Sequence, residues 1–457
     1  MLPKGVIKKL KSIVGEENFL DSPEDLISYS YDATLPEFMP EAVLLPTTTE
    51  EVSQIMSVAN EEGIPVTPRG AGTNISGGSI PKQGGLVLSF AKMNKIIKID
   101  RENRYAILQP GVINAEFQRE VEKLNLFYPP DPASMSVSTI GGNVAENAGG
   151  PRGVKYGVTR DYLLGLEVVL PSGEVIRTGG KTTKNVTGYD LTRLFCGSEG
   201  TLGVITEITV KLLPLPEARR TAQAIYSNLD DCSNTVSRIL QAGIVPSTLE
   251  LMDKVQMNVI EDFAHIGLPR EAEGLLLIEV DGPEAGIDQQ LNQVAEFCKS
   301  QGASEVKVAR TPAEAEELWR ARRVAYGALA RLRPSCLVED ATVPVNALTT
   351  LIREVQRIAQ KYDLTISMLA HAGDGNSHPV ILADSRDKKE MEKVEKALRE
   401  IAEAAIRLEG TLSGEHGIGI LKKEFLPLVM SETEIELMRK IKKTFDPKGI
   451  LNPGMFV

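Results

Sequence analysis

Cysteine is scarce in this sequence, and the few cysteines stand far apart. Cys196, Cys232, Cys298 and Cys336 form no CxxC pair. Such spacing excludes the ligand set of an iron–sulfur cluster and the disulfide framework of a small secreted domain. Isolated thiols suit a reducing compartment, so we expect a cytoplasmic protein; attachment to a membrane through a partner is the alternative.

Long apolar runs and clusters of basic residues are also missing. No run reaches the roughly 18 apolar residues of a membrane-spanning helix, and the first residues lack the apolar core of a secretory signal. Lys and Arg number 51 against 62 Asp and Glu, a net charge of −11, and they are dispersed along the chain. Because nucleic-acid-binding proteins gather basic residues against phosphates, we expect neither a membrane span nor a nucleic-acid partner.

The chain of 457 residues is too long for one ordinary core, which predicts two or three domains. Beyond Pro214 and Pro216, helical stretches alternate with strands, whereas strands and turns dominate much of the chain before them. The pattern predicts an α+β fold. Its expected parts are a helical lead-in over 1–37, a first domain over 38–216, an α+β domain over 217–400 and a C-terminal segment over 401–457.

Two short segments carry clear cap and turn signals. Thr48 and Glu51 have the spacing of a capping box, and a helical period follows until Gly63, where we expect the helix to end. The segment 166–179 reads as two strands around a Pro-Ser-Gly turn, which predicts a hairpin.

Glycine is concentrated in two loops of the first half. PRGAGTNISGG, residues 68–78, fails the GxGxxG pattern at Ile75 and the P-loop pattern at Gly78, where a lysine is required. Residues 129–157 hold six more glycines among short Ser, Thr and Asn side chains. Backbone N–H groups without a neighbouring Cβ can approach an anion closely. For the first loop a pyrophosphate-binding loop and a mobile surface turn are both open. We interpret the second loop as ligand-binding rather than as a bland linker.

These loops, with KNVTGYDLTRLFCGSEGTLGVITEITVKLLP, resemble the FAD-binding domain of the vanillyl-alcohol oxidase and p-cresol methylhydroxylase (PCMH) superfamily over about residues 38–216. HAGDGNSHP, SGEHGIG and FDPKGILNPG are similar to motifs of its D-lactate dehydrogenase and glycolate oxidase catalytic-subunit branch. The resemblance implies a two-subdomain PCMH-type FAD-binding domain, an α+β substrate (cap) domain, and a C-terminal segment that returns to the flavin.

The resemblance also implies which residues hold FAD. The pyrophosphate would lie on the first loop, the flavin and ribityl chain on the second, and the adenine near Ile205. No His or Cys occurs among the first 195 residues, so we expect non-covalent FAD. The full expected set is Pro68, Arg69, Gly70, Ala71, Gly72, Thr73, Asn74, Pro132, Ser134, Thr139, Gly141, Gly142, Asn143, Asn147, Gly149, Gly150, Tyr156, Gly157, Ile205 and Asn452.

Histidine is as scarce as cysteine, and three of the four histidines fall in two short motifs. His371 and His378 flank the sequence AGDGNS, and His416 follows Glu415. Two imidazoles and a carboxylate suit Zn²⁺, Mn²⁺ or Fe²⁺. We therefore predict that His371, His378 and Glu415 bind a divalent metal, the alternative being polar loop residues at a domain edge. His265 is expected at a helix surface or boundary.

Two more residues receive roles from the resemblance. His416 would be the general base, for which an imidazole titrating near neutral pH is suited. On an extended backbone its side chain would point away from that of Glu415. Arg322, in a W-x-x-R pattern with Trp319, would bind the substrate carboxylate with its planar fork; a solvated helix face is the alternative.

Together these features predict an FAD- and metal-dependent dehydrogenase that oxidises a small D-2-hydroxy acid, D-lactate or glycolate, to the 2-oxo acid. Val338 and Val380 stand where the 2-hydroxyglutarate branch carries polar residues, which favours a monocarboxylate. The alternatives are a D-2-hydroxyglutarate-type dehydrogenase and an FAD subunit of a larger electron-transfer complex.

The electron acceptor is not visible in the sequence. An iron–sulfur subunit, an electron-transferring flavoprotein, a quinone or a cytochrome would serve as the acceptor. A homodimer stays open.

Three rival functions make different predictions. A metal hydrolase would be colourless, a silent flavin-binding subunit would lack the C-terminal metal motifs, and a flavin reductase or ether-lipid synthase of the same fold would lack the metal.

Overall fold

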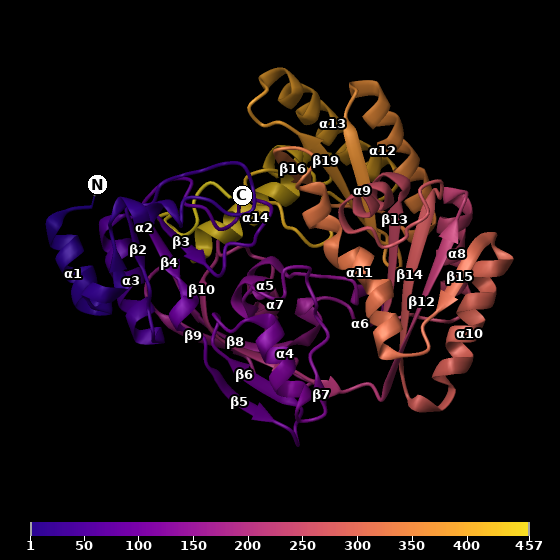
Figure 1. Ribbon diagram of the computed structural model, residues 1–457. Helices are drawn as coiled ribbons and strands as arrows, with labels where there is room; N and C mark the ends of the chain where they lie inside the picture. Colours follow the sequence, from indigo (N-terminus) through magenta and orange to yellow (C-terminus); the bar gives the residue numbers. More distant parts are fainter. Residues whose placement is uncertain (1, 456–457) are drawn as a thin grey trace. The chain divides into compact units, whose positions relative to one another are not determined.

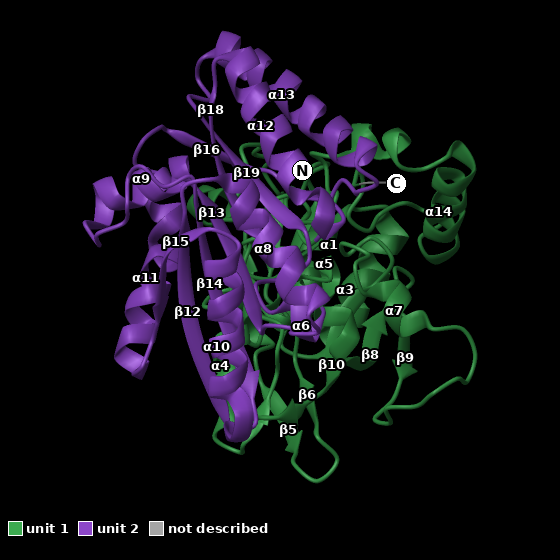
Figure 2. Cartoon of the chain, turned by 90° about the vertical axis from the view of Figure 1, so that its right-hand side faces the viewer, with its two compact units in different colours: residues 1–149, 158–215, 415–457 green, residues 150–157, 216–414 purple. Residues whose placement is uncertain are grey.

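The structure is a computed structural model that describes residues 2–455 and divides into two compact units. Of the described residues, unit 1 holds 2–149, 158–215 and 415–455, and unit 2 holds 150–157 and 216–414 (Figure 2). Each unit is therefore assembled from segments far apart in the chain, as the colours of Figure 1 show. Across these residues no helix combines the length and apolar character needed to cross a membrane.

The N-terminal part of unit 1 is a four-stranded sheet with helices. The strand order is β1 (Phe19–Leu20), β2 (Ala42–Leu44), β4 (Leu86–Ser89) and β3 (Val66–Arg69), and the last three strands run parallel. Helices α1 (Lys4–Val14) and α3 (Thr49–Glu62) bury their apolar stripes in one core with this sheet, and α2 (Pro23–Ile27) lies between β1 and β2 in the chain. The first glycine loop begins in the last two residues of β3 and continues beyond the strand.

The cap of α3 differs in part from the expectation. Thr48 Oγ1 accepts a hydrogen bond from the Glu51 N–H at 3.1 Å, and Gly63 ends the helix in the left-handed region, as predicted. The Glu51 carboxylate, however, accepts from the N–H of Thr47 at 2.6 Å. The second hydrogen bond of the predicted capping box, from the Thr48 N–H to the Glu51 carboxylate, is therefore wrong, because the carboxylate binds the N–H of the preceding residue instead.

The second sheet of unit 1 is antiparallel throughout. Its order is β5 (Ile96–Asp100), β6 (Tyr105–Leu108), β10 (Val204–Lys211), β8 (Leu163–Val169) and β9 (Val175–Gly179). The β8–β9 pair confirms the predicted hairpin. The short helices α4 (Asn114–Glu122), α5 (Ile140–Glu146) and α7 (Leu191–Phe195) belong to the same unit, as do the pair β7 (Leu126–Phe127) and β11 (Leu213–Pro214) and helix α14 (Glu432–Phe445).

Unit 2 is built on one antiparallel sheet. The strand order is β15 (Ala303–Val308), β12 (Ala218–Tyr226), β14 (Gly274–Gly282), β13 (Thr248–Asp253), β18 (Thr365–His371), β19 (Asn376–Ala383) and β16 (Ser335–Val338), and β17 (Ala341–Thr342) also pairs with β19. Helices α8 (Leu229–Gln241), α10 (Glu284–Ser300), α12 (Leu348–Tyr362) and α13 (Lys388–Arg407) share one apolar core with the sheet. Helices α9 (Lys254–Ala264) and α11 (Pro312–Leu329) share a second core on its other face (Figure 2).

Strand alternation separates the two cores. On β13, Leu249 and Leu251 join the first core, whereas Met252 joins the second. Successive side chains point to opposite faces of a sheet, so Glu250 shares the face of α9 and α11. The same alternation on β18 and β19 puts His371 and His378 on this face, and that arrangement builds the polar site described below.

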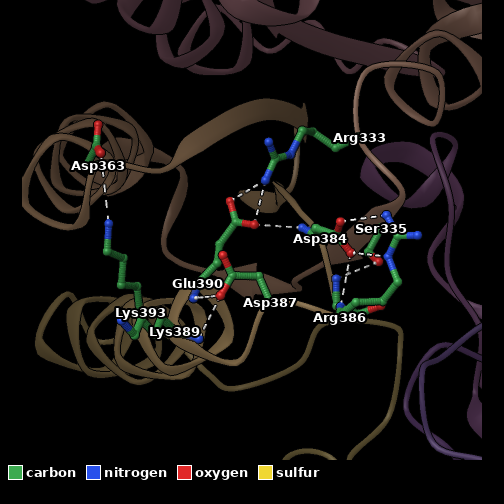
Figure 3. A network of polar contacts seen from close by, with 10 residues as sticks. Arg333, Ser335, Asp363, Asp384, Arg386, Asp387, Lys389, Glu390 and Lys393 are labelled. Atoms are coloured by element: carbon green, nitrogen blue, oxygen red, sulfur yellow. Dashed lines mark hydrogen bonds and ion pairs between the residues drawn. The ribbon is translucent and has the colours of Figure 1, made fainter.

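A polar network holds the turn that leads from β19 into α13 (Figure 3). Asp387 caps α13 by accepting from the N–H groups of Lys389 and Glu390 at 2.9 and 3.3 Å. Glu390 in turn accepts from Arg333 at 2.5 Å and from the Asp384 N–H at 2.8 Å. The network ties the end of β19 to the chain just before β16, and so supports the strand that carries His378.

Candidate active site

The two glycine loops of unit 1 touch each other. A Cβ on Gly70 would overlap Thr139 Oγ1, and a Cβ on Gly78 would lie 2.9 Å from Glu146 Oε1. Thr139 caps α5 by accepting from the Gly142 N–H at 3.1 Å. At Gly70 a larger residue would have to displace Thr139 of the other loop, whereas at Gly78 the contacted atom is the end of a longer side chain that can move.

Several buried polar atoms beside these loops have no hydrogen-bond partner among the described residues. They include Asn143 Nδ2, Asn452 Oδ1 and Ser138 Oγ. An unpaired buried polar atom is costly and usually indicates a missing partner. Asn143 offers a donor and Asn452 an acceptor, and the sequence assigns both residues to FAD. A cofactor that carries both donors and acceptors, as FAD does, fits these atoms.

The C-terminal tail lies against the first glycine loop. The Asn452 N–H donates to the Val66 carbonyl at 2.7 Å, and Asn452 Nδ2 donates to the carbonyls of Gly78 and Glu199, each at 2.8 Å. Ile205 lies on β10 at a bulge in its pairing with β8, where the backbone leaves the regular ladder and can face a ligand. Both residues therefore occupy positions compatible with the predicted cofactor contacts.

The predicted cofactor residues divide between the two units. Those from Pro68 to Gly149, together with Ile205 and Asn452, belong to unit 1, whereas Gly150, Tyr156 and Gly157 belong to unit 2. The Tyr156 hydroxyl donates to Asp281 Oδ2 at 2.8 Å, and Lys155 Nζ lies 2.5 Å from Asp281 Oδ1. The second glycine loop thus crosses from one unit to the other, which its sequence does not indicate.

Two buried carboxyl groups that the sequence did not single out lie beside the first loop. Glu199 accepts from the N–H groups of Ile418 and Gly419 at 2.8 and 2.7 Å, and Glu146 accepts from Asn74 Nδ2 at 2.5 Å. Burial raises the pKa of Glu199 to about 7. Burial, followed by the charge of Glu199, raises the pKa of Glu146 well above its usual range. The pair therefore retains a proton near neutral pH.

In unit 2 the predicted metal ligands His371 and His378 lie together. His371 ends β18 directly opposite Glu250 of β13, and His378 of β19 pairs with Leu369, two residues before His371. The two imidazole rings meet edge to face with centroids 5.0 Å apart, and the two residues offer ligand atoms within 4.8 Å of each other. The pleat places both rings on the face of α9 and α11.

Both imidazoles turn Nδ1 toward an oxygen. His371 Nδ1 lies 2.6 Å from Glu250 Oε1, and His378 Nδ1 lies 3.3 Å from the Glu339 carbonyl oxygen. A neutral imidazole that donates from Nδ1 carries its lone pair on Nε2. This is the arrangement in which histidine ligands are usually held in metal sites, so the pair is suited to bind a metal through Nε2.

Arg322 joins the same group through Glu250. Arg322, on α11, donates from Nε to Glu250 Oε2 at 2.7 Å, and its side chain is only 14% exposed. Burial favours the neutral form of Glu250, but its interactions with His371 and Arg322 prevail and hold its pKa at about 2. The alternative of a solvated helix face is therefore wrong for Arg322, because its side chain is largely buried.

The predicted ligand Glu415 and the predicted base His416 begin the last segment of unit 1. The backbone bends here instead of extending, and His416 Nε2 approaches Glu415 Oε1 to 3.7 Å. The expectation that the two side chains point to opposite sides is thus wrong. Gly414, the last residue of unit 2, packs tightly on Asn376, where a Cβ would lie 3.0 Å from its amide carbon. The remaining histidine, His265, is exposed at the C-cap of α9.

Two family models match the chain: the FAD binding domain over residues 40–179, and the C-terminal domain of FAD linked oxidases over residues 215–456. The chain belongs to the FAD-linked oxidases. This FAD-linked oxidase is 51% identical to the glycolate oxidase subunit GlcD of Bacillus subtilis (strain 168), over 99% of the chain and 97% of the relative. It is 37% identical to the D-lactate dehydrogenase of Anaerostipes hadrus, over 98% of the chain and 96% of the relative.

Solved structures bear out the fold. A p-cresol methylhydroxylase with substrate bound matches with a TM-score of 0.82 at 19% identity, covering 99% of this chain and 97% of that chain. An alkyldihydroxyacetonephosphate synthase matches with a TM-score of 0.79 at 19% identity, over 99% and 85%. The predicted PCMH-type α+β fold, the FAD cofactor and the oxidoreductase class of this FAD-linked oxidase are therefore confirmed. The role of each residue toward FAD stays a prediction.

Replacing Gly70 with Ala should weaken FAD binding. Because the new Cβ would overlap Thr139 Oγ1, the two glycine loops must separate, and we expect at least tenfold weaker affinity, about 1.4 kcal/mol. Flavin absorbance of the purified protein and FAD titration of the stripped protein measure this. Gly180→Ala is the control, since a Cβ there has nothing within 4 Å. Equal FAD affinity in both variants would show that the contact between the loops is not needed for FAD.

Replacing Glu146 with Gln should flatten the dependence of stability on pH. Below about pH 4.5 the Glu146 and Glu199 carboxyl groups are protonated in both the folded and the unfolded chain. As the pH rises toward 7, only the folded chain retains a proton on this pair, so the free energy of unfolding of the wild type falls. One pKa unit corresponds to about 1.4 kcal/mol, and we expect the variant to gain about 1–3 kcal/mol relative to wild type between pH 5 and 7.5. Urea unfolding at both pH values measures this, with exposed Glu62→Gln as control. Parallel curves for wild type and E146Q would contradict the shared-proton interpretation.

Proposed function

We propose that this chain oxidises a small D-2-hydroxy acid, D-lactate or glycolate, to the 2-oxo acid with the help of a divalent metal. The observation that carries the proposal is the group Glu250, His371, His378 and Arg322 in unit 2. A buried hydrogen-bonded network joins His371 through Glu250 to the guanidinium of Arg322. The ring of His378, the other potential metal ligand, lies edge to face against the ring of His371. Relatives named glycolate oxidase subunit and D-lactate dehydrogenase support the same substrate class.

The metal site would use His371 and His378 through Nε2. Glu415 is the proposed third ligand, and one peptide bond joins it to Gly414, which packs on Asn376 of β19. Consecutive Cα atoms are about 3.8 Å apart, so chain continuity supports this choice. The donor set of two imidazoles and one carboxylate suits Zn²⁺, Mn²⁺ or Fe²⁺. A metal held there would lower the pKa of the substrate hydroxyl.

The chain's other residues would orient the substrate and move its proton. Arg322 would bind the substrate carboxylate with its terminal amino groups, since Nε is engaged by Glu250. His416 would accept the hydroxyl proton. Bound FAD would supply the two-electron acceptor for the hydrogen on C2.

The size of the substrate follows from a pair of valines. Val338 at the end of β16 lies opposite Val380 of β19, and Val380 is two residues from His378. Both valines pack in the core that includes α9 and α11, so they form an apolar wall near the proposed metal. A second carboxylate would be desolvated there without a partner, which disfavours D-2-hydroxyglutarate.

Electrons must leave the reduced protein through another molecule. We propose a protein acceptor, an iron–sulfur subunit or an electron-transferring flavoprotein, with a quinone as alternative and the cytoplasm as the place of reaction. The name of the Bacillus subtilis relative, a subunit, supports a partner.

A holoenzyme screen tests the substrate and the metal. Under anaerobic conditions, D-lactate or glycolate should bleach the flavin absorbance near 450 nm, whereas L-lactate and D-2-hydroxyglutarate should react at least tenfold more slowly. Prior treatment with a chelator should abolish bleaching, and added Mn²⁺ or Zn²⁺ should restore it. Bleaching that is insensitive to chelation would overturn the metal proposal, and no bleaching by any 2-hydroxy acid would overturn the substrate class.

The variant His416→Ala tests the base. Removal of a general base typically lowers the rate by about 10²–10⁴-fold, so we expect flavin reduction by substrate to slow at least a hundredfold while FAD stays bound. His265→Asn is the matched control, because His265 is exposed at a left-handed helix end that Asn tolerates. Stopped-flow absorbance measures both variants. Reduction of H416A at a rate close to wild type would make the base assignment wrong.

A further inference from the structure

Glu250 is a fully buried carboxylate that no predicted role accounts for. It lies in the middle of β13, and its side chain is 0% exposed. Both oxygens are engaged: Oε1 by His371 Nδ1 at 2.6 Å, and Oε2 by Arg322 Nε at 2.7 Å. Its two partners come from β18 and α11, 121 and 72 residues further along the chain.

A buried carboxylate in this position is expensive to keep. The free-energy cost of desolvating a charge is offset only by close partners with good geometry. Well-packed apolar residues in the same position would stabilise the protein at least as well. The flanking residues Leu249 and Leu251 belong to the apolar core on the opposite face of β13. The stability of the sheet therefore does not explain why a glutamate occupies position 250, whereas an effect of Glu250 on its two partners does.

We propose that Glu250 is a positioning residue that couples the two halves of the substrate site, His371 and Arg322. This inference rests on the proposed function and deepens it. By accepting a hydrogen bond from the Nδ1–H group, Glu250 holds His371 in the tautomer whose Nε2 can bind a metal, and it fixes the plane of the ring. By accepting from Nε, it turns the two terminal amino groups of Arg322 toward a substrate carboxylate.

The coupling has a geometric consequence. His371, the proposed metal ligand, and Arg322, the proposed carboxylate-binding residue, contact the two oxygens of one carboxylate group. A rigid planar group on a central strand therefore sets the separation of these two side chains. Groups held on regular strands are placed more accurately than groups on loops. A 2-hydroxy acid presents its hydroxyl and its carboxylate on adjacent carbons, and a fixed separation of the two recognition groups suits such a ligand.

Glu250→Gln is the direct test, and Asp253→Asn is the matched control. Gln keeps the size of the side chain but cannot accept from both partners. Asp253 is equally buried on the same strand and caps α9 by accepting from the Gln256 N–H at 2.8 Å, with no role in the proposed site. Mn²⁺ is titrated calorimetrically into chelator-stripped holoenzyme, and KM and kcat for D-lactate and glycolate are measured on the metal-loaded protein.

We expect E250Q to bind Mn²⁺ about 10–100-fold more weakly than wild type and to raise KM at least tenfold, with the flavin spectrum and circular dichroism unchanged. D253N should keep the affinity for Mn²⁺ within about twofold. The double variant E250Q/R322Q should raise KM no further than R322Q alone, since Glu250 acts on the substrate through Arg322. Additive effects on KM would overturn that part of the proposal.

Failure of this inference is distinguishable from failure of the proposed function. If wild type binds no Mn²⁺ and oxidises substrate after chelation, the metal site itself is wrong. If wild type binds Mn²⁺ and E250Q binds it equally well with an unchanged KM, the positioning role is wrong and Glu250 is a structural ion pair only. Should E250Q not fold, Glu250→Asp carries the same test, because the shorter side chain keeps the charge but cannot reach both partners.

Discussion

Side chains two residues apart on a strand point to the same face of a sheet, and in unit 2 this constraint determines where the chemistry lies. It turns Glu250, His371 and His378 to the face of α9 and α11, and it turns Leu249 and Leu251 to the opposite core. A shift of one residue in the pairing of β13 with β18 would separate Glu250 from His371 and bury a leucine in its place. The proposed site therefore depends on the register of three central strands.

The buried carboxyl groups of Glu250 in unit 2 and of Glu146 and Glu199 in unit 1 differ in their charge. Glu250 keeps its charge, because a guanidinium and an imidazole outweigh the cost of burial. Glu146 and Glu199 have no such cations, and burial raises both pKa values so that the pair retains a proton. The first arrangement suits a place where groups must be held in orientation. The carboxyl pair of unit 1 ties the segment that follows His416 to the glycine loops, because Glu199 accepts hydrogen bonds from the N–H groups of Ile418 and Gly419.

The flavin part and the metal part of the chain rest on different kinds of evidence. FAD follows from the family. The close approach of Gly70 to Thr139 and the unpaired atoms Asn143 Nδ2 and Asn452 Oδ1 give it a physical basis. The proposed metal site rests on the geometry of His371 and His378, whose Nδ1 atoms both face oxygens. The two parts are complementary, because oxidation of an alcohol needs an acceptor for two electrons and a means to release the hydroxyl proton.

The sequence alone determined much of this protein. Motifs around the glycine loops and the clustered histidines identified the family, the cofactor and the α+β fold, because such motifs are local and their spacing is visible along the chain. Local signals also determined the end of α3 at Gly63 and the β8–β9 hairpin. The folded structure was needed to show that Glu51 reaches Thr47, that the chain bends at Glu415 and His416, and that residues 150–157 belong to unit 2. It alone revealed Glu250, which stands among core leucines with nothing in its neighbourhood to mark it. Its partners are distant in sequence, and strand register, which no local pattern encodes, brings them together.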